Sequence, residues 1–525
     1  MKMEYGRARG LGAHRTSVLM LLATVVALAW GAAASSHPPP HGSAPEQQRQ
    51  SPHHGQWPFG GFGRSSQIQV DVDQAGGIQG AHHRQAEQPQ ASHTLSISHS
   101  QARRSLVRAG EPSRLHRAMQ KLLRGQPATV TIVGGSISVG HGSIDLRKSY
   151  ANRVFAWLNS TFPDHGRLTL HNGAFGGSTS EYMSLCLQEH VPLNSDIVLV
   201  DYAVNDAAIH ATADWQSDAR RAFERLLRQL LDYPHRPAVI LLELYSYLFS
   251  GTEGSFFKTG EDVHSVFAQY YDLTWLSARN AFYHAFSAGL PGFHLNISAT
   301  PEDFYYDTVH PNAYGHQKIA DIVINFLQHS IADVSSLSWP AATLSNEGGT
   351  DHLPSPMLEG NHHQSSALRC LHAEQLKGAA VGGSGFEWGF DQSFDSRKYG
   401  FIATEPGSVL KLQVNTTSEA TSTGLVDVYV GHLRSYGGMG KFGVRCIEGC
   451  RCAPSLMSGH HTDRTSQRYF TTIPAVTQHE RCVLAVVVAE ETDSGGHRVR
   501  IDGLVVSPEE SRRRRSPINR MPSVY

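Results

Sequence analysis

Residues 128–136 read ATVTIVGGS, a β-branched, apolar run that ends in two glycines and a serine. This pattern predicts a short buried strand that stops at a sharp turn. Three further runs resemble it, at 168–171 (LTLH), 196–201 (DIVLVD) and 238–244 (AVILLEL). Helix-like segments separate the four runs. Strands that are apolar throughout and alternate with helices are typical of a parallel sheet covered on both faces.

The covering helices are predicted from amphipathic segments. They lie at 114–124, 150–158, 180–190, 214–231 and 311–327, and residues 262–288 hold a further helix and a short strand. We therefore expect an α/β domain over residues 110–332. Ligand sites in such sheets form beyond the carboxyl ends of the strands, so residues that carry chemistry should come directly after each strand.

Three post-strand loops carry groups suited to acyl chemistry. In the first, Ser136 follows Gly134 and Gly135 at a helix start, where its hydroxyl is exposed and its backbone N–H can meet an oxyanion. In the second, 172–179 (NGAFGGST), Gly177 lets a backbone N–H approach a ligand. In the third, 202–206 (YAVND), Asn205 offers an amide donor. Each loop alone has an ordinary alternative: a flexible loop, a βα turn or a helix N-cap.

The fourth loop, 307–311 (DTVHP), places Asp307 three residues before His310. On a loop that enters a helix, the two side chains can point together. The carboxylate can then fix the imidazole tautomer, and the imidazole can take a proton from a serine. Alone, this pair would be a capping aspartate and a surface histidine.

The four loops together resemble the SGNH (GDSL-type) hydrolase family over residues 127–327. The resemblance implies a flavodoxin-like three-layer parallel sheet, the SGNH hydrolase fold. It implies that Ser136 is the nucleophile and that Asp307 and His310 are its orienter and base. It also implies an oxyanion hole formed by the backbone N–H groups of Ser136 and Gly177 and the side chain of Asn205. No metal and no organic cofactor are implied.

The chain departs from the family pattern at two positions. The aspartate of the usual G-D-S is Gly135, and the glycine of G-x-N-D is Ala203. The second loop is most similar to the N-x-A-x-x-G-x-S form of carbohydrate acetylesterases. It matches that form through Asn172, Ala174, Gly177 and Thr179.

These residues predict a serine esterase that hydrolyses acyl esters, acetyl esters above all, on an extracellular or lumenal glycan. The substrate would be an acylated polysaccharide or a small ester. A glycan O-acyltransferase with the same site, and a catalytically silent cell-surface glycan-binding protein, are the alternatives. The formal net charge of −1 and the pI of about 7.2 provide no electrostatic footprint for nucleic acid.

Other polar and aromatic residues lie near the loops in the sequence. His141, Asp145, His171 and Asp201 could each touch substrate, but structural roles are favoured, and Tyr245 and Tyr247 could line a pocket. Trp388, Tyr429 and Tyr436 could stack on sugar rings or belong to a core.

Residues 1–36 are predicted to be a signal peptide or a retained signal anchor. Basic residues precede the apolar stretch 17–34, and small residues follow it. We expect the protein to be secreted or in the lumen of the secretory pathway, with anchoring by 17–34 as the alternative. Three glycosylation triplets, at Asn159, Asn296 and Asn415, fit that compartment.

The remaining segments differ in composition. We expect disorder in the His/Pro/Gln-rich stretch 37–105, a linker at 333–366, a β-sandwich-like domain at 367–507 and a basic tail at 508–525. Five of the six cysteines lie in the C-terminal third. Disulfides are favoured there over a zinc site, whose ligands would come from Cys446, Cys450, Cys452 and His460 or His461. Cys186 is interpreted as a buried thiol.

Overall fold

The computed structural model describes residues 93–162, 168–206, 217–248, 254–295, 303–336, 353–361, 369–390, 399–421, 423–462 and 465–508. The predicted signal segment and the basic tail after 508 lie outside these residues, as does Asn296. None of the helices formed by the described residues combines the length and the apolar composition that a bilayer crossing requires.

A parallel sheet forms from the four predicted apolar runs and one further strand. Its strands are β2 (Ala128–Gly134), β3 (Leu168–Asn172), β4 (Ile197–Asp201), β5 (Ala238–Glu243) and β6 (Thr274–Ser277), and β1 (Leu106–Arg108) adds antiparallel to β6. In chain order the five parallel strands are arranged 2-1-3-4-5, which is the flavodoxin-like order. The predicted fold class is confirmed. The strand order reverses between β2 and β4, and this switch point is where ligands bind in such sheets.

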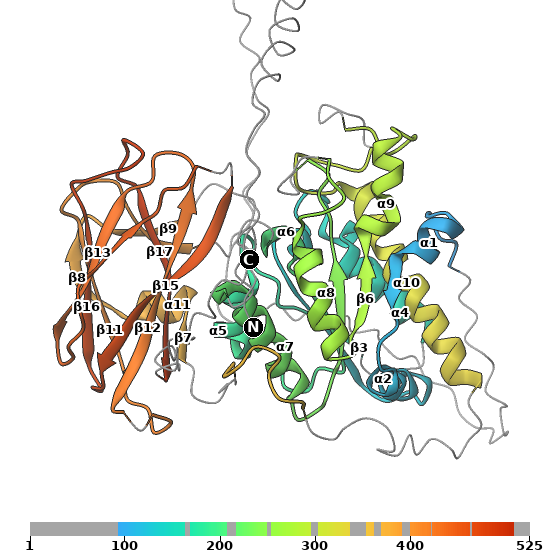
Figure 1. Cartoon of the computed structure of the whole chain (residues 1–525), viewed down its shortest axis with the longest axis horizontal. Coiled ribbons are helices and arrows are strands. Elements are labelled where there is room, and N and C mark those ends of the chain that lie inside the picture. Colours follow the sequence, from blue (N-terminus) through green and yellow to red (C-terminus); the bar gives the residue numbers. More distant parts are fainter. Residues whose placement is uncertain are drawn as a thin grey trace, which may run out of the picture. The chain divides into compact units, whose positions relative to one another are not determined.

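Helices cover both faces of the sheet (Figure 1). One face carries α2 (Ser113–Leu123), α4 (Tyr150–Thr161), α9 (Ala278–Ser287) and α10 (Ala313–Ser336). The other carries α5 (Ser180–His190), α7 (Asp218–Leu231) and α8 (Gly260–Tyr270). The side chains of one strand alternate between the two cores, since Ile132 packs in the first core and Val133 in the second. This burial on both faces explains why the strand is apolar throughout.

Residues 93–105, which the sequence predicts to be disordered, are folded. Residues 99–105 form α1 (His99–Ser105), which begins with a capping box between Ser98 and Gln101. Just before it, the Ser96 hydroxyl donates to the Asp321 carboxylate at 2.5 Å, and His93 bonds the same carboxylate at 2.8 Å. The prediction of disorder through residue 105 is therefore wrong for residues 93–105. Composition could not reveal this anchor, because Asp321 is more than two hundred residues away.

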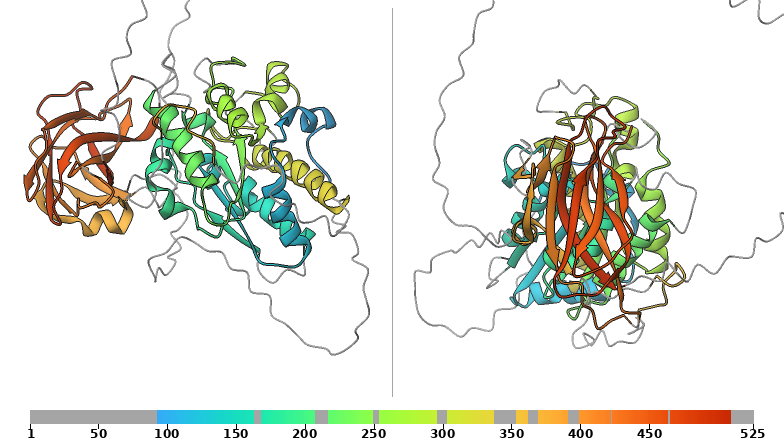
Figure 2. Two further views of the ribbon diagram at one scale, coloured as in Figure 1. Left: turned by 60° about the horizontal axis from the view of Figure 1, so that its bottom comes forward. Right: turned by 90° about the vertical axis from the view of Figure 1, so that its left-hand side faces the viewer.

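The C-terminal part is an antiparallel sandwich of two sheets, as predicted (Figure 2). The first sheet contains β15 (Ser466–Thr477), β12 (Leu425–Ser435), β17 (Val499–Pro508), β10 (Tyr399–Ala403) and β9 (Glu387–Phe390), with β7 (Arg369–Leu371) paired to β17. The second contains β14 (Ser455–Ser458), β13 (Lys441–Glu448), β16 (Cys482–Val488), β11 (Val409–Val414) and β8 (Ala380–Ser384). Helix α11 (Ala373–Gly378) contributes Leu376 to the core between the sheets.

Part of the predicted linker packs on the α/β part. The backbone N–H of Met357 donates to Glu224 at 2.5 Å, and the Asn361 amide donates to the same carboxylate at 2.7 Å. Glu224 is fully buried on α7. These bonds satisfy a buried carboxyl group that would otherwise be costly to bury.

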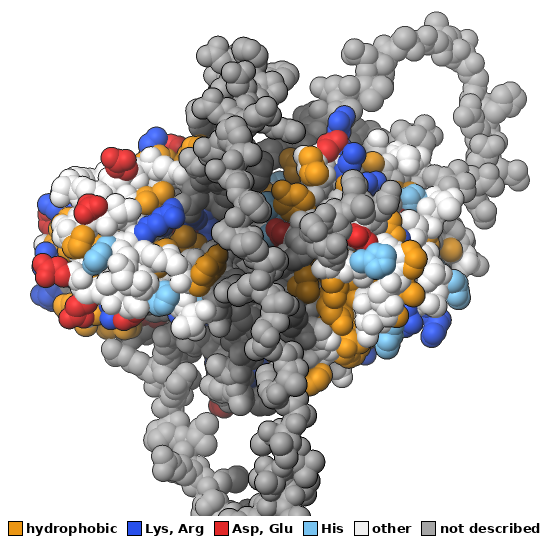
Figure 3. All heavy atoms as spheres, turned by 90° about the horizontal axis from the view of Figure 1, so that it is seen from above, with side chains coloured by type: hydrophobic (Ala, Val, Ile, Leu, Met, Phe, Trp, Pro, Cys, Tyr) orange, Lys and Arg blue, Asp and Glu red, His pale blue; other side chains and the backbone are white. Residues whose placement is uncertain are grey.

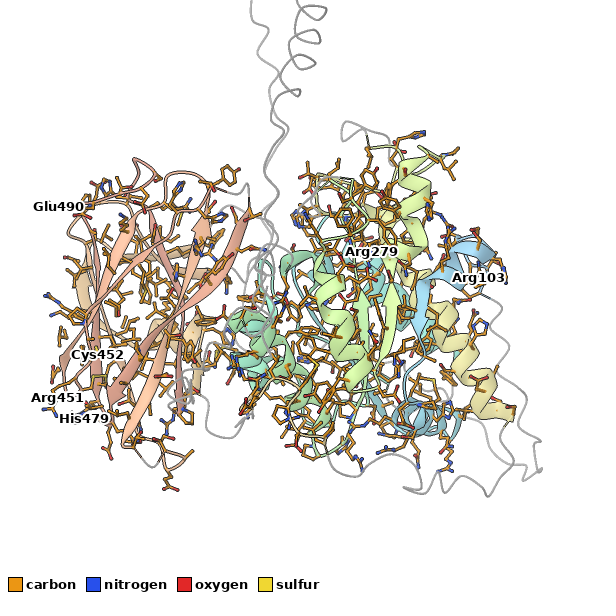
Figure 4. All side chains as sticks on the ribbon, viewed as in Figure 1. Arg103, Arg279, Arg451, Cys452, His479 and Glu490 are labelled. Carbon is orange, nitrogen blue, oxygen red and sulfur yellow. A yellow bond between two sulfur atoms is a disulfide. The ribbon has the colours of Figure 1, made fainter. Side chains whose placement is uncertain are left out.

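All six cysteines form disulfides: Cys186–Cys370, Cys446–Cys452 and Cys450–Cys482. The interpretation of Cys186 as a thiol is wrong, because Cys186 on α5 pairs with Cys370 on β7. The thiolates that a zinc site would need are therefore used in disulfides. Figure 4 labels Cys452 at one end of the sandwich, close to Arg451 and His479.

The three disulfides should differ in what they contribute to stability. Cys186–Cys370 spans 184 residues and Cys446–Cys452 only 6. In the chain-entropy model, the loss would be about 5 kcal/mol for the first pair and about 2 kcal/mol for the second. We expect urea unfolding to show the larger loss for Cys186→Ser/Cys370→Ser, with Cys446→Ser/Cys452→Ser as the matched variant. Equal losses would contradict this.

Candidate active site

The predicted site residues lie at the carboxyl edge of the sheet, around the switch point. Ser136 opens the short helix α3 (Ser136–Val139) directly after β2, and Asn205 lies on α6 (Ala203–Asp206) directly after β4. The parallel register pairs Gly134 with Asp201. Because the paired strands end together, residues 70 or so apart in the sequence meet at one edge.

A hydrogen-bonded line joins Ser136, His310 and Asp307. The Ser136 Oγ lies 2.7 Å from the His310 Nε2, and the His310 Nδ1 lies 2.8 Å from an Asp307 carboxylate oxygen. The other Asp307 oxygen accepts the backbone N–H groups of Val309 and His310, both at 2.7 Å. The structure thus brings together the three residues expected from the sequence.

The electrostatics of this line favour an ionised carboxylate. Burial alone would raise the pKa of Asp307, but the His310 imidazole and the two backbone N–H groups lower the pKa to about 2. An ionised Asp307 favours the tautomer with the proton on the His310 Nδ1. The Nε2 is then free to accept the serine hydroxyl proton.

Hydrogen bonds and a ring contact fix the loop that carries His310. The backbone N–H of Tyr306 donates to the His310 carbonyl at 2.8 Å, and the Ser246 hydroxyl donates to the Thr308 carbonyl at 2.9 Å. The ring of His141 packs against the ring of His310 with centroids 4.1 Å apart. His141 thus neighbours the site, although sequence reasoning favoured a structural role for it.

Asn205 and Gly135 are packed against each other. The Asn205 amide donates to the Ser178 carbonyl at 2.6 Å. A Cβ at Gly135 would lie 2.4 Å from the Asn205 Nδ2, closer than real Cβ contacts allow. The amide therefore occupies the space that a side chain at 135 would need. This crowding gives a physical reason for the first departure from the family pattern.

The second loop is tied to the first through backbone contacts. Phe175 donates its N–H to the Gly134 carbonyl at 2.9 Å, and the Asn172 amide donates to the Ser138 carbonyl at 2.9 Å. Gly177 has a φ of +74°, which glycine adopts without strain. These bonds join the loop that carries Gly177 to the residues on either side of Ser136.

A buried ionic chain lies next to the third loop, and sequence reasoning missed it. Asp206 accepts the backbone N–H of Ser180 at 3.0 Å and contacts the His264 Nε2 at 3.3 Å. The His264 Nδ1 lies 3.0 Å from Glu243. Burial alone would lower the pKa of His264, but Glu243 and Asp206 raise the pKa to about 9. These contacts link β5, α8 and α6 to the start of α5.

The other polar candidates have structural contacts. Asp201 accepts the Ser138 hydroxyl at 2.6 Å, and burial raises the pKa of Asp201 to about 7. Asp145 caps the 3-10 helix η1 (Leu146–Lys148), and His171 is buried. The Tyr245 hydroxyl donates to the Ser255 carbonyl at 2.8 Å, and Tyr247 is half-buried.

The aromatic candidates of the sandwich have different environments. Tyr429 is buried in the core that also holds Phe175. Trp388 is half-buried and stacks on Tyr399 with centroids 6.1 Å apart, whereas Tyr436 is 53% exposed. Of the three candidates, only Trp388 and Tyr436 retain a surface that a sugar ring could contact.

The raised pKa of His264 predicts a pH dependence of stability. A group whose pKa is about 9 in the fold and 6.5 unfolded stabilises fully below pH 6.5 and loses that contribution as the pH rises through 9. We expect the free energy of unfolding to fall over this window by at most about 1.4 kcal/mol per pH unit. Urea unfolding at several pH values measures it.

His264→Gln should flatten this dependence, whereas His329→Gln, at an exposed position on α10, should leave it unchanged. A wild-type profile equal to that of His264→Gln between pH 6.5 and 9 would rule out a charged His264 in the fold.

Comparison with known proteins gives a match to one family model over part of the chain and a likeness of fold. Residues 132–318 match the model of the GDSL-like lipase/acylhydrolase family. A solved two-domain esterase (CEX) active on acetylated mannans is 20% identical, with a TM-score of 0.55, over 78% of this chain and 99% of that chain. The same esterase co-crystallised with mannopentaose is 20% identical, with a TM-score of 0.53, over 78% and 98%. This likeness shows a shared fold. No curated protein matches the chain.

Proposed function

We propose, from the premise that residues 132–318 form a domain of the GDSL-like lipase/acylhydrolase family, that this chain is a serine esterase acting on acyl esters of a glycan. The observation that carries the proposal is the line of bonds of 2.7 Å and 2.8 Å from Ser136 through His310 to Asp307. A hydroxyl alone is a weak nucleophile at neutral pH, and an adjacent base within hydrogen-bond reach activates it.

The proposed reaction proceeds in two steps. His310 takes the hydroxyl proton while the Ser136 Oγ attacks the ester carbonyl, and the tetrahedral intermediate then expels the alcohol, which receives the proton from His310. The acyl group now sits on Ser136. A water molecule, deprotonated by His310, attacks the acyl-enzyme and releases the carboxylic acid, and the proton returns to Ser136.

The negative charge of the tetrahedral intermediate requires donors that are already in place. We assign this role to the backbone N–H groups of Ser136 and Gly177 and to the side chain of Asn205. One of the two N–H groups of the Asn205 amide donates to the Ser178 carbonyl. That bond orients the amide, whose second N–H is the one assigned to the oxyanion.

An acetylated extracellular polysaccharide is the proposed substrate. A structure that shares the fold belongs to an esterase active on acetylated mannans, and the second loop resembles that of carbohydrate acetylesterases. The three disulfides fit an oxidising compartment. Asn159 and Asn415 are exposed, as glycosylation would need. We therefore propose secretion or residence in the secretory lumen, with anchoring by residues 17–34 as the alternative.

A nucleic-acid partner is not proposed. On the face shown in Figure 3, the acidic and basic side chains of the described residues are interspersed rather than gathered in one basic patch. The net charge of −1 agrees with this surface, because nucleic-acid binding relies on clustered positive charge.

Replacement of the nucleophile tests the proposal directly. Ser136→Ala should lower the hydrolysis of p-nitrophenyl acetate, and the release of acetate from acetylated polysaccharides, on the order of a thousandfold or more. Ser160→Ala, at an exposed position on α4, should retain full activity. Activity in Ser136→Ala comparable to wild type would sink the assignment.

The packing of Gly135 generates a second test. Gly135→Ala places a methyl group 2.4 Å from the Asn205 Nδ2, so the amide must move. We expect kcat for p-nitrophenyl acetate to fall on the order of a hundredfold, as when an oxyanion donor is lost. Gly437→Ala is the matched control, because its Cβ meets no atom within 4 Å. A Gly135→Ala variant with wild-type kcat would show that the Asn205 position is unimportant.

A further inference from the structure

Strand β15 of the sandwich contacts two of the three loops to which oxyanion donors are assigned. The Gln467 Nε2 donates to the Asn205 carbonyl at 2.8 Å. The backbone N–H of Arg468 donates to the Gly177 carbonyl at 3.0 Å. Two successive residues from a separate sheet therefore bind the backbone of Asn205 and of Gly177. Gln467 is 5% exposed and Arg468 is 2% exposed, so water competes little for these bonds.

The Arg468 side chain holds the same loop by a second contact. Its guanidinium lies 3.7 Å from the centroid of the Phe175 ring, two residues before Gly177. Its Nε lies 3.3 Å from the Asp502 carboxylate, which also pairs with Arg500 at 2.9 Å. The Asp502 carboxylate is thus shared by two guanidinium groups, and the Arg468 cation also stacks on an aromatic face.

Apolar packing and a covalent bond hold β15 against this edge. The rings of Tyr182 on α5 and Phe470 on β15 are stacked with centroids 5.6 Å apart, and both side chains are buried. The Cys186–Cys370 disulfide joins α5, which begins just after the Gly177 loop, to β7 of the sandwich. The contact therefore has the features of a permanent interface rather than of a transient encounter.

We propose that Gln467 and Arg468 are positioning residues for the oxyanion hole, and that the sandwich is a structural part of the esterase site. This inference rests on the proposed esterase function. An oxyanion donor acts only when it is held near 3 Å from the developing charge before the reaction starts, and misplacement by a fraction of an ångström is costly. By fixing the carbonyls of Asn205 and Gly177, β15 limits the motion of both loops.

The test uses the full chain and a small substrate. Gln467→Met keeps the length of the side chain and removes the donor to the Asn205 carbonyl, together with the weaker contact from the Tyr469 hydroxyl. With p-nitrophenyl acetate, a substrate too small to need glycan contacts, we expect kcat to fall about tenfold, less than when an oxyanion donor itself is removed. KM should change by less than about twofold, because ground-state binding is untouched.

The readout is kcat per active serine, with the serines counted by fluorophosphonate titration, so that a smaller folded fraction does not mimic the effect. Gln413→Met is the matched control, because Gln413 is half-buried on β11 of the opposite sheet, and it should keep the wild-type kcat. If Gln467→Met does not fold, Gln467→Ala removes the same donor with less apolar bulk and decides in its place.

The outcomes separate the two proposals. A Ser136-dependent activity that Gln467→Met leaves unchanged overturns the positioning role alone. Wild-type protein whose hydrolysis does not depend on Ser136 overturns the esterase function and, with it, this inference. A tenfold lower kcat with unchanged KM, absent in Gln413→Met, supports it.

Discussion

The parallel pairing of β2 with β4 is the constraint on which the rest of the site depends. The register places Gly134 beside Asp201, so the two strands end at the same level. Ser136 lies on α3 directly after β2, and Asn205 lies on α6 directly after β4. After β2 the chain continues to α4 on one face of the sheet, and after β4 it continues to α7 on the other face, as is typical of a switch point at which ligands bind. The loop bearing Asp307 and His310 meets Ser136 at this point.

Close backbone packing around the serine follows from this pairing. Gly134 and Gly135 lie where side chains would collide with Ser138 and with the Asn205 amide. The position of the Asn205 amide thus leaves no room for a side chain at position 135. Beneath the loops, Asp206, His264 and Glu243 form a buried chain of charges. Such groups are costly unless paired, so they hold their elements in one arrangement.

The sandwich contacts the loops around the site directly. A β-rich module after a linker suggests an appended unit that acts on its own. Instead, Gln467 and Arg468 bind the backbone of the two loops that follow β3 and β4, and a disulfide joins the sandwich to α5. The residues around the serine are therefore supported from two sides: from the parallel sheet below and from β15.

The sequence by itself determined the local features of this protein. The apolar runs predicted β2 to β5, and the four post-strand loops indicated Ser136, Gly177, Asn205, Asp307 and His310 as candidate site residues, because these signals depend on residues close together in the chain. Only the tertiary structure decided which residue pairs with Cys186 and that residues 93–105 fold against Asp321. It also decided which carboxyl groups lie beside His264 and which loops Gln467 and Arg468 contact. Each of these depends on a partner far along the chain, and no local pattern specifies which distant residue the fold will bring within bonding distance.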